Sequence, residues 1–96
     1  MYNLTFLSIA NRDIQNIVSY YDDINSTLSD VFLKEMEDTK SFILQNPDAC
    51  PKRIRNIRVS YLKRFRYGVF FKRYKDEIIV IAVLHTSRNP EIWQKR

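Results

Sequence analysis

The sequence predicts an α+β fold in which a helical hairpin packs on a small antiparallel sheet, in the order strand, helix, helix, strand, strand, strand. Apolar residues recur at helical spacing between residues 14 and 43, and the apolar period changes to two after Pro51. The length of 96 residues, of which 45% are hydrophobic, is sufficient for one modest core. We therefore expect a single domain over residues 1–96.

The first expected elements are a strand over residues 2–7 and a helix after it. The segment YNLTFL alternates and is rich in strand formers. Ser8 is a candidate N-cap, and Asp13 is close enough to the positive end of the helix to be favourable there. The apolar stripe of this helix, at the spacing i, i+3, i+4, i+7, consists of Ile14, Ile17, Val18 and Tyr21.

A second amphipathic helix is expected to begin near Ser26 or Thr27 and to end at Asn46, because Pro47 disfavours a helical residue before it. Its apolar face consists of Leu28, Val31, Phe32, Met36, Thr39 and Ile43. The connection between the two helices is short, which predicts that they form an antiparallel hairpin.

Three strands are expected in the second half of the chain, within residues 57–61, 65–72 and 78–84. The first two alternate apolar and polar residues, whereas IIVIAVL at 78–84 is apolar throughout and predicts a central strand covered on both faces. One helical hairpin covers only one sheet face, so we expect the second face to be the working face. Its expected basic and aromatic surface consists of Arg66, Gly68, Phe70 and Lys72.

Charge is divided unevenly along the chain. Residues 1–50 carry three Lys/Arg against eight Asp/Glu, a net charge of −5, and residues 51–96 carry thirteen against three, a net charge of +10. The basic half is therefore expected to contact an anionic partner, either a nucleic acid or an acidic protein segment. The residues that we expect to bind such a partner are Arg58, Lys63, Arg64, Arg66, Lys72, Arg88 and Trp93.

The residues that common catalytic centres require are scarce. With one histidine, one cysteine and a single glycine, the sequence offers neither a zinc cluster of the usual composition nor a Cys/His pair nor a phosphate-cradling loop. We expect no metal and no cofactor. The lone Cys50, the lack of a signal peptide and the lack of an apolar run of about 20 residues predict a cytoplasmic protein without membrane contact.

Four segments resemble the toxins of the RelE/ParE superfamily of type II toxin–antitoxin modules. They are ANRDIQNIVSYY at 10–21, FLKEMEDTKSFILQNP at 32–47, RVSYLKRFRYGVFFKR at 58–73 and AVLHTSRNPEIW at 82–93, in this order across nearly all of the chain. The resemblance implies two helices against a small antiparallel sheet. It also implies a cognate acidic antitoxin that folds on the toxin and neutralises it.

The resemblance leaves the target open. RelE-like members cleave mRNA in the ribosomal A site, whereas ParE-like members poison DNA gyrase. Gly68 follows Tyr67 where the RelE pattern has an arginine, and Trp93 takes the C-terminal place of a tyrosine or histidine, although an indole cannot act as an acid or base. These departures favour a ParE-like toxin of a plasmid-stabilisation module that inhibits growth by binding gyrase.

Two alternatives remain at this point. One is a RelE-like, ribosome-dependent mRNA endoribonuclease that uses Arg66, His85 and Arg88 and inhibits translation. The other is a member without toxicity. For His85 we favour a hydrogen-bonded residue that closes a strand end, and for Trp93 a side chain that packs the C-terminal segment back onto the domain.

Overall fold

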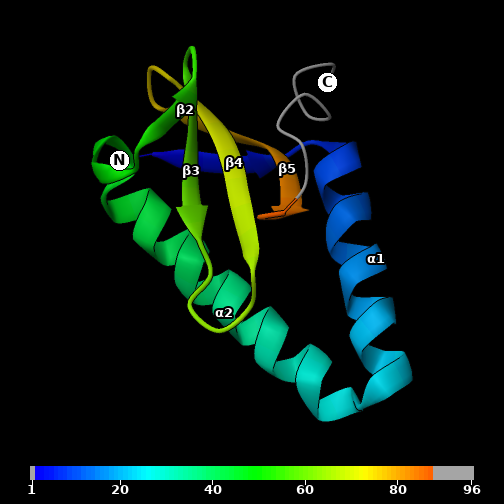
Figure 1. The fold of residues 1–96 in the computed structure, drawn as a ribbon. Helices are drawn as coiled ribbons and strands as arrows, with labels where there is room; N and C mark the ends of the chain where they lie inside the picture. The colour runs from blue at the N-terminus through cyan, green and yellow to red at the C-terminus, as the bar shows by residue number, and fades with distance from the viewer. Residues whose placement is uncertain (1, 88–96) are drawn as a thin grey trace.

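The computed structural model describes residues 2–87, and the order of its elements confirms the α+β class and the helical hairpin (Figure 1). No helix within these residues is long and apolar enough to span a membrane. The elements are β1 (Asn3–Phe6), α1 (Ser8–Ile24), α2 (Ser26–Gln45), the 3-10 helix η1 (Pro47–Ala49), β2 (Lys52–Ile54), β3 (Ile57–Tyr61), β4 (Tyr67–Tyr74) and β5 (Glu77–His85).

The strands form one mixed sheet in the order β1-β5-β4-β3-β2. The apolar β5 is paired on both edges, as its composition predicts. The prediction of an all-antiparallel sheet is wrong for β1, which runs parallel to β5 from Asn3↔Glu77 to Phe6↔Val80. Side chains alternate in the same way in parallel and antiparallel strands, so the sequence pattern does not reveal strand direction. The short, polar β2 was also not expected.

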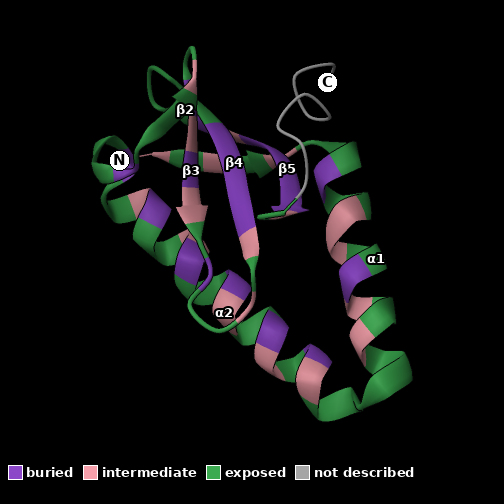
Figure 2. Ribbon diagram, in the orientation of Figure 1, coloured by how far each residue is buried: buried purple, intermediate pink, exposed green. Residues whose placement is uncertain are grey.

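The two helices cover one face of the sheet and meet at the single residue Asn25, from which they diverge (Figure 1). The Asn25 side chain accepts a hydrogen bond of 2.8 Å from the N–H of Thr27 and so caps α2. The prediction that Ser8 is the N-cap of the first helix is wrong. Ser8 is already part of α1, and Leu7 occupies the N-cap position without a side-chain hydrogen bond. The helical stripes confirm the predicted core side of each helix (Figure 2).

The core between the helices and the sheet consists of apolar side chains from both layers. Its fully or nearly buried members include Ala10, Ile17, Phe32, Met36, Ile43, Val69, Phe71, Ile78, Val80 and Val83. A second, smaller cluster occupies the opposite face of the sheet and consists of Ile57, Val59, Phe70, Ile81, Ala82 and Leu84. These two clusters explain why 78–84 is apolar throughout.

A bulge in β5 places two consecutive residues in the smaller cluster. Phe70 pairs with Ala82 and Phe71 pairs with Val80, which leaves Ile81 as the extra residue. Ile81 and Ala82 therefore both lie on the second face, and Val83 returns to the helix-covered face.

Gly68 lies at a crowded position of the second face, opposite Tyr61 on β3. A Cβ on Gly68 would come within 2.9 Å of Val59 Cγ2, 3.2 Å of Tyr61 Cε1 and 3.3 Å of Phe70 Cε2. Its φ is not positive, so glycine is required here by space and not by backbone conformation. The Tyr61 ring takes the place that a side chain at position 68 would need.

Gly68→Ala is expected to lower the free energy of unfolding by about 1–3 kcal/mol, because the added methyl group overpacks the cluster. Urea denaturation measures the change. Ser41→Ala, on the exposed side of α2, is the matched control and should change stability by less than about 0.5 kcal/mol. Adding Val59→Ala to Gly68→Ala should cost less than the two single changes together, and an unaltered midpoint for Gly68→Ala would contradict this packing.

Candidate binding surface

The basic residues of the second half do not form one surface. Lys63, Arg64 and Arg66 lie in the connection between β3 and β4, residues 62–66, which we call the basic loop. It lies at the end of the sheet where β5 finishes, since the N–H of Thr86 donates to the Arg66 carbonyl at 2.8 Å. Lys72 lies towards the opposite end, paired with Ile57 near the β2–β3 turn (Figure 1).

The predicted basic and aromatic surface on the second sheet face is therefore wrong. Phe70 is only 6% exposed and Gly68 is buried, while Arg66 precedes β4 and belongs to the basic loop. Of the four residues expected there, only Lys72 is an exposed residue on this face. The alternation of apolar and polar residues begins at Phe65, two residues before β4 begins. The sequence pattern therefore wrongly assigns Arg66 to the strand.

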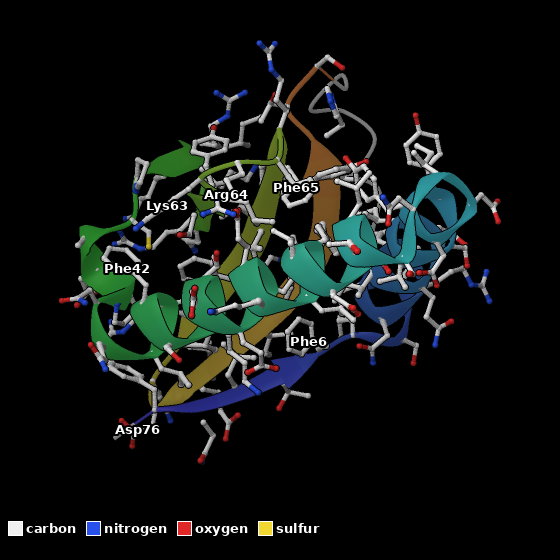
Figure 3. All side chains as sticks on the ribbon, turned by 90° about the horizontal axis from the view of Figure 1, so that it is seen from below. Phe6, Phe42, Lys63, Arg64, Phe65 and Asp76 are labelled. Carbon is white, nitrogen blue, oxygen red and sulfur yellow. The ribbon has the colours of Figure 1, made fainter. Side chains whose placement is uncertain are left out.

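Glu35 of α2 fixes the backbone of the basic loop. Its Oε1 accepts hydrogen bonds from the N–H groups of Lys63 at 3.1 Å and of Arg64 at 3.0 Å, and its Oε2 lies 3.6 Å from Arg64 Nε. The Glu35 side chain is 13% exposed, whereas that of Arg64 is 76% exposed. The loop backbone is thus held on α2, beside which Figure 3 labels Lys63 and Arg64, while the cations at positions 63, 64 and 66 are exposed.

Phe65 anchors the same loop from inside. Its ring meets Tyr21 at 5.0 Å and Phe32 at 5.5 Å between centroids, both edge-to-face, and Tyr67 packs on Phe32 at 5.8 Å. These aromatic residues therefore belong to the core. These contacts hold in place the backbone that carries Lys63, Arg64 and Arg66.

Arg58 is engaged within the chain. Its Nη1 donates to the Cys50 carbonyl at 2.6 Å and to the Asp48 carbonyl at 3.2 Å, and its Nη2 lies 3.9 Å from Asp48 Oδ1. The side chain is only 18% exposed, so it ties β3 to the turn around η1. Burial raises the pKa of the neighbouring Cys50 thiol, against the opposing effects of Ser60 and Arg58.

His85 is the last residue of β5. Its Nδ1 lies 2.7 Å from Ser87 Oγ and accepts the Ser87 N–H at 3.2 Å, and its ring packs edge-to-face on Tyr67 at 5.3 Å between centroids. This arrangement matches the interpretation of a hydrogen-bonded residue at a strand end. Arg88 and Trp93, also expected to bind a partner, lie outside the described residues.

Asp13 has a position that the sequence interpretation missed. Its Oδ2 accepts the N–H of Val83 at 3.0 Å, at the part of the β5 edge that lies beyond the last residue of β1. The carboxylate thus extends the hydrogen bonding of the sheet instead of only balancing the helix dipole. The available signal was its place four residues before the buried Ile17, on the same side of α1.

Two clefts flank the sheet where the helices diverge from it. The first, of about 300 Å³, lies between α1 and β5 and is lined by Asp13, Asn16, Ile17, Tyr20, Tyr67, Val83, Leu84 and His85. The second, of about 290 Å³, lies between α2 and β3 and is lined by Glu35, Asp38, Thr39, Phe42, Ser60, Tyr61 and Lys63. Across residues 2–87, no group of three or more His, Cys, Asp or Glu is placed to hold a metal ion.

Known proteins share this fold and this sequence pattern. The family model described as the ParE toxin of the type II toxin–antitoxin system parDE matches residues 4–90. A solved structure described as the chromosomal ParDE TA system from P. aeruginosa superposes with a TM-score of 0.77 at 16% identity, covering 88% of this chain and 96% of that chain. At that identity the likeness shows the fold alone. No curated protein sequence matches the chain.

Glu35→Ala is expected to loosen the basic loop and to lower the free energy of unfolding by about 1–3 kcal/mol, because two backbone N–H groups lose a charged acceptor. Amide hydrogen exchange at Lys63 and Arg64 should become faster. Glu37→Ala, an exposed acid on the same helix, is the control and should leave both amides protected. Equal exchange in the two variants would show that Glu35 does not hold the loop.

Proposed function

We propose, from the fact that the chain belongs to the ParE toxin family of type II toxin–antitoxin systems, that it inhibits growth by binding DNA gyrase and does not cleave RNA. It acts in the cytoplasm as part of a module that stabilises a plasmid. A cognate acidic antitoxin holds it inactive.

The crowding at Gly68 is the observation that carries this proposal. In RelE-like ribonucleases an arginine follows the strand tyrosine, which here is Tyr67. The ring of Tyr61 and the side chains of Val59 and Phe70 already fill the space into which a side chain at position 68 would extend. A guanidinium for phosphate contact therefore has no place here, and this supports a toxin that acts by binding.

The environment of His85 supports the same conclusion. A general acid or base needs a ring nitrogen directed at the reacting group. Nδ1 is engaged with Ser87 of the same chain segment, and the ring packs edge-to-face with Tyr67. These contacts support a role of the imidazole in closing the end of β5.

A ribosome-dependent endoribonuclease is the second candidate function. One observation favours it: the hydrogen bond from Thr86 to the Arg66 carbonyl holds the segments of His85 and Arg66 side by side. An exposed arginine next to a histidine is a combination that phosphodiester cleavage uses. The nuclease candidate would require both side chains for activity, and this requirement separates it from the gyrase proposal.

The exposed cations of the basic loop support an acidic antitoxin as the partner. Lys63, Arg64 and Arg66 are all exposed, and Glu35 neutralises only one of them at the 3.6 Å distance to Arg64. A flexible acidic segment that orders on this surface gains charge–charge contacts that partly offset the entropy lost on ordering.

The purified protein is expected to inhibit supercoiling by DNA gyrase and to leave mRNA intact in a translating extract. His85→Ala should retain growth arrest, because it removes only a strand-end contact. Asn16→Ala, in the same cleft, provides a matched substitution without loss of the imidazole. Loss of arrest in His85→Ala alone, together with ribosome-dependent cleavage by the unaltered protein, would establish the nuclease instead.

The affinity for the antitoxin, which we expect to be encoded in the neighbouring reading frame, should fall as salt rises. Charges on the basic loop are screened over about 8 Å at physiological ionic strength. Isothermal titration calorimetry at several salt concentrations measures this dependence. An affinity independent of salt would mean that the basic half is not the contact surface.

A further inference from the structure

Two tight turns lie at the end of the sheet opposite the basic loop. Arg55 and Asn56 connect β2 to β3, and Lys75 and Asp76 connect β4 to β5. Figure 1 shows the β2–β3 turn projecting beyond the body of the sheet. We call residues 52–58 the basic hairpin, since four of these seven residues are Lys or Arg.

The backbone of Arg55 has a conformation that arginine seldom adopts. Its φ is 51°, in the left-handed region where the β-carbon comes too close to the following carbonyl oxygen. Two-residue turns with a positive φ at this position favour glycine. Residues held in such conformations gather at sites that bind ligands. A contact made by the guanidinium would explain an arginine where glycine is the more stable choice.

A cleft of about 390 Å³ lies beside this turn and is lined by Ile54, Arg55, Asn56, Ile57 and Lys72. Ile57 and Lys72 are cross-strand partners, so their side chains lie on the same face of the sheet. Ile57 is buried and Ile54 is half-buried, whereas the other three residues are exposed. The cleft therefore has an apolar floor and a rim of two cations and one amide.

The two cations of this cleft are not neutralised by the rest of the described chain. Among the residues that the structure describes, neither Arg55 nor Lys72 forms an ion pair or a side-chain hydrogen bond. The neighbouring Arg73 differs, because its Nε lies 3.5 Å from Asp48 Oδ1 and its Nη2 donates to the Tyr2 hydroxyl at 2.8 Å. The cations of the cleft thus remain available to an external anion.

We propose that the basic hairpin binds the phosphate backbone of duplex DNA, with one phosphate in the cleft between Arg55 and Lys72. The inference rests on the proposed function for its setting: the duplex is the DNA that gyrase holds, so the toxin contacts the enzyme and its DNA together. A two-stranded ribbon fits the major groove, which is about 12 Å wide. Lys52 and Arg53 of β2 are exposed and add contacts to neighbouring phosphates.

The side chains at this end favour a duplex over a single strand. Proteins that bind single strands combine cations with aromatic rings on which the bases stack. No aromatic residue lines the cleft. The exposed ring of Tyr74 lies near the turns, but Lys75 Nζ is 5.9 Å from its centroid and already engages it. Residues 49–75 contain ten Lys/Arg and no Asp or Glu, so a line of phosphates meets no like charge along this segment.

Fluorescence anisotropy with a short labelled DNA duplex tests the site in the full chain. Binding is expected to weaken as salt rises from about 50 mM, because bound phosphates release counterions. Lys72→Ala should lower the affinity about threefold to tenfold and the slope of log K against log salt by about 1, as loss of one phosphate contact predicts. Lys34→Ala removes an exposed cation of α2 and is the matched control, with neither quantity changed.

Other outcomes of this titration would contradict the proposal. Absence of duplex binding at low salt, or equal losses in Lys72→Ala and Lys34→Ala, would overturn it. A loss in Lys63→Ala without one in Lys72→Ala would place the DNA on the basic loop. Single-stranded RNA or poly-glutamate that displaces the labelled duplex better than unlabelled duplex does would assign the hairpin to RNA or to an acidic protein.

Substitutions of Arg55 separate binding from folding. Arg55→Gly relieves the left-handed conformation, so the urea midpoint should rise while the affinity for DNA falls about threefold to tenfold. Arg55→Lys keeps both the charge and the β-carbon, and its affinity should stay within about twofold of the unaltered chain. A parallel loss of stability and affinity in Arg55→Gly would make the arginine a structural residue and contradict the phosphate site.

Gyrase assays distinguish failure of this inference from failure of the proposed function. Lys72→Ala should need about threefold to tenfold more toxin to inhibit supercoiling, matching its loss of DNA affinity, and should bind DNA-free gyrase as the unaltered chain does. Inhibition by a toxin that binds no duplex would overturn the hairpin site and leave the proposed function intact. Duplex binding at the hairpin without any effect on gyrase would overturn the proposed function and leave the site intact.

Discussion

Burial of β5 on both faces is the constraint on which the rest of the structure depends. The helical hairpin and the core around Phe32 and Phe71 cover one face, and the cluster around Val59 and Phe70 covers the other. Because β5 is also paired along both edges, with β1 on one side and β4 on the other, it holds the N-terminal strand and the C-terminal half of the chain together. The apolar area that it removes from water is the main contribution that a strand of this composition makes to stability.

The sequence predicted those features that depend on local periodicity. The stripe from Phe32 to Ile43 identifies the core side of α2, and IIVIAVL identifies an internal strand. Strand direction, the bulge at Ile81 and the contact between Glu35 and the basic loop were not predictable in this way. Periodicity contains no information on direction, a bulge breaks the period, and Glu35 and Lys63 are separated by 28 residues. Arg66 is wrongly assigned to the strand for a related reason, since the alternation of apolar and polar residues begins two residues before β4 does.

The sequence predicts which residues are basic, but it does not predict where the fold places them. The basic half was recognised from charge, but the fold separates its cations into the basic loop and the end near Lys72, and it commits Arg58 to internal hydrogen bonds. The same strand that carries the tyrosine of the superfamily pattern has no space for a side chain at Gly68. A basic loop that is exposed and held by contacts to Glu35 and Tyr21 is suited to binding another protein. It is less suited to positioning the groups of a self-contained catalytic centre.

The proposed mode of action of this toxin is protein–protein binding. The most direct measurement is the binding of the purified chain to purified DNA gyrase and, in parallel, to vacant 70S ribosomes, with and without saturating antitoxin. We expect a complex with gyrase that the antitoxin prevents, and no specific complex with the ribosome. Binding to the ribosome in the absence of binding to gyrase would contradict the proposed mode of action.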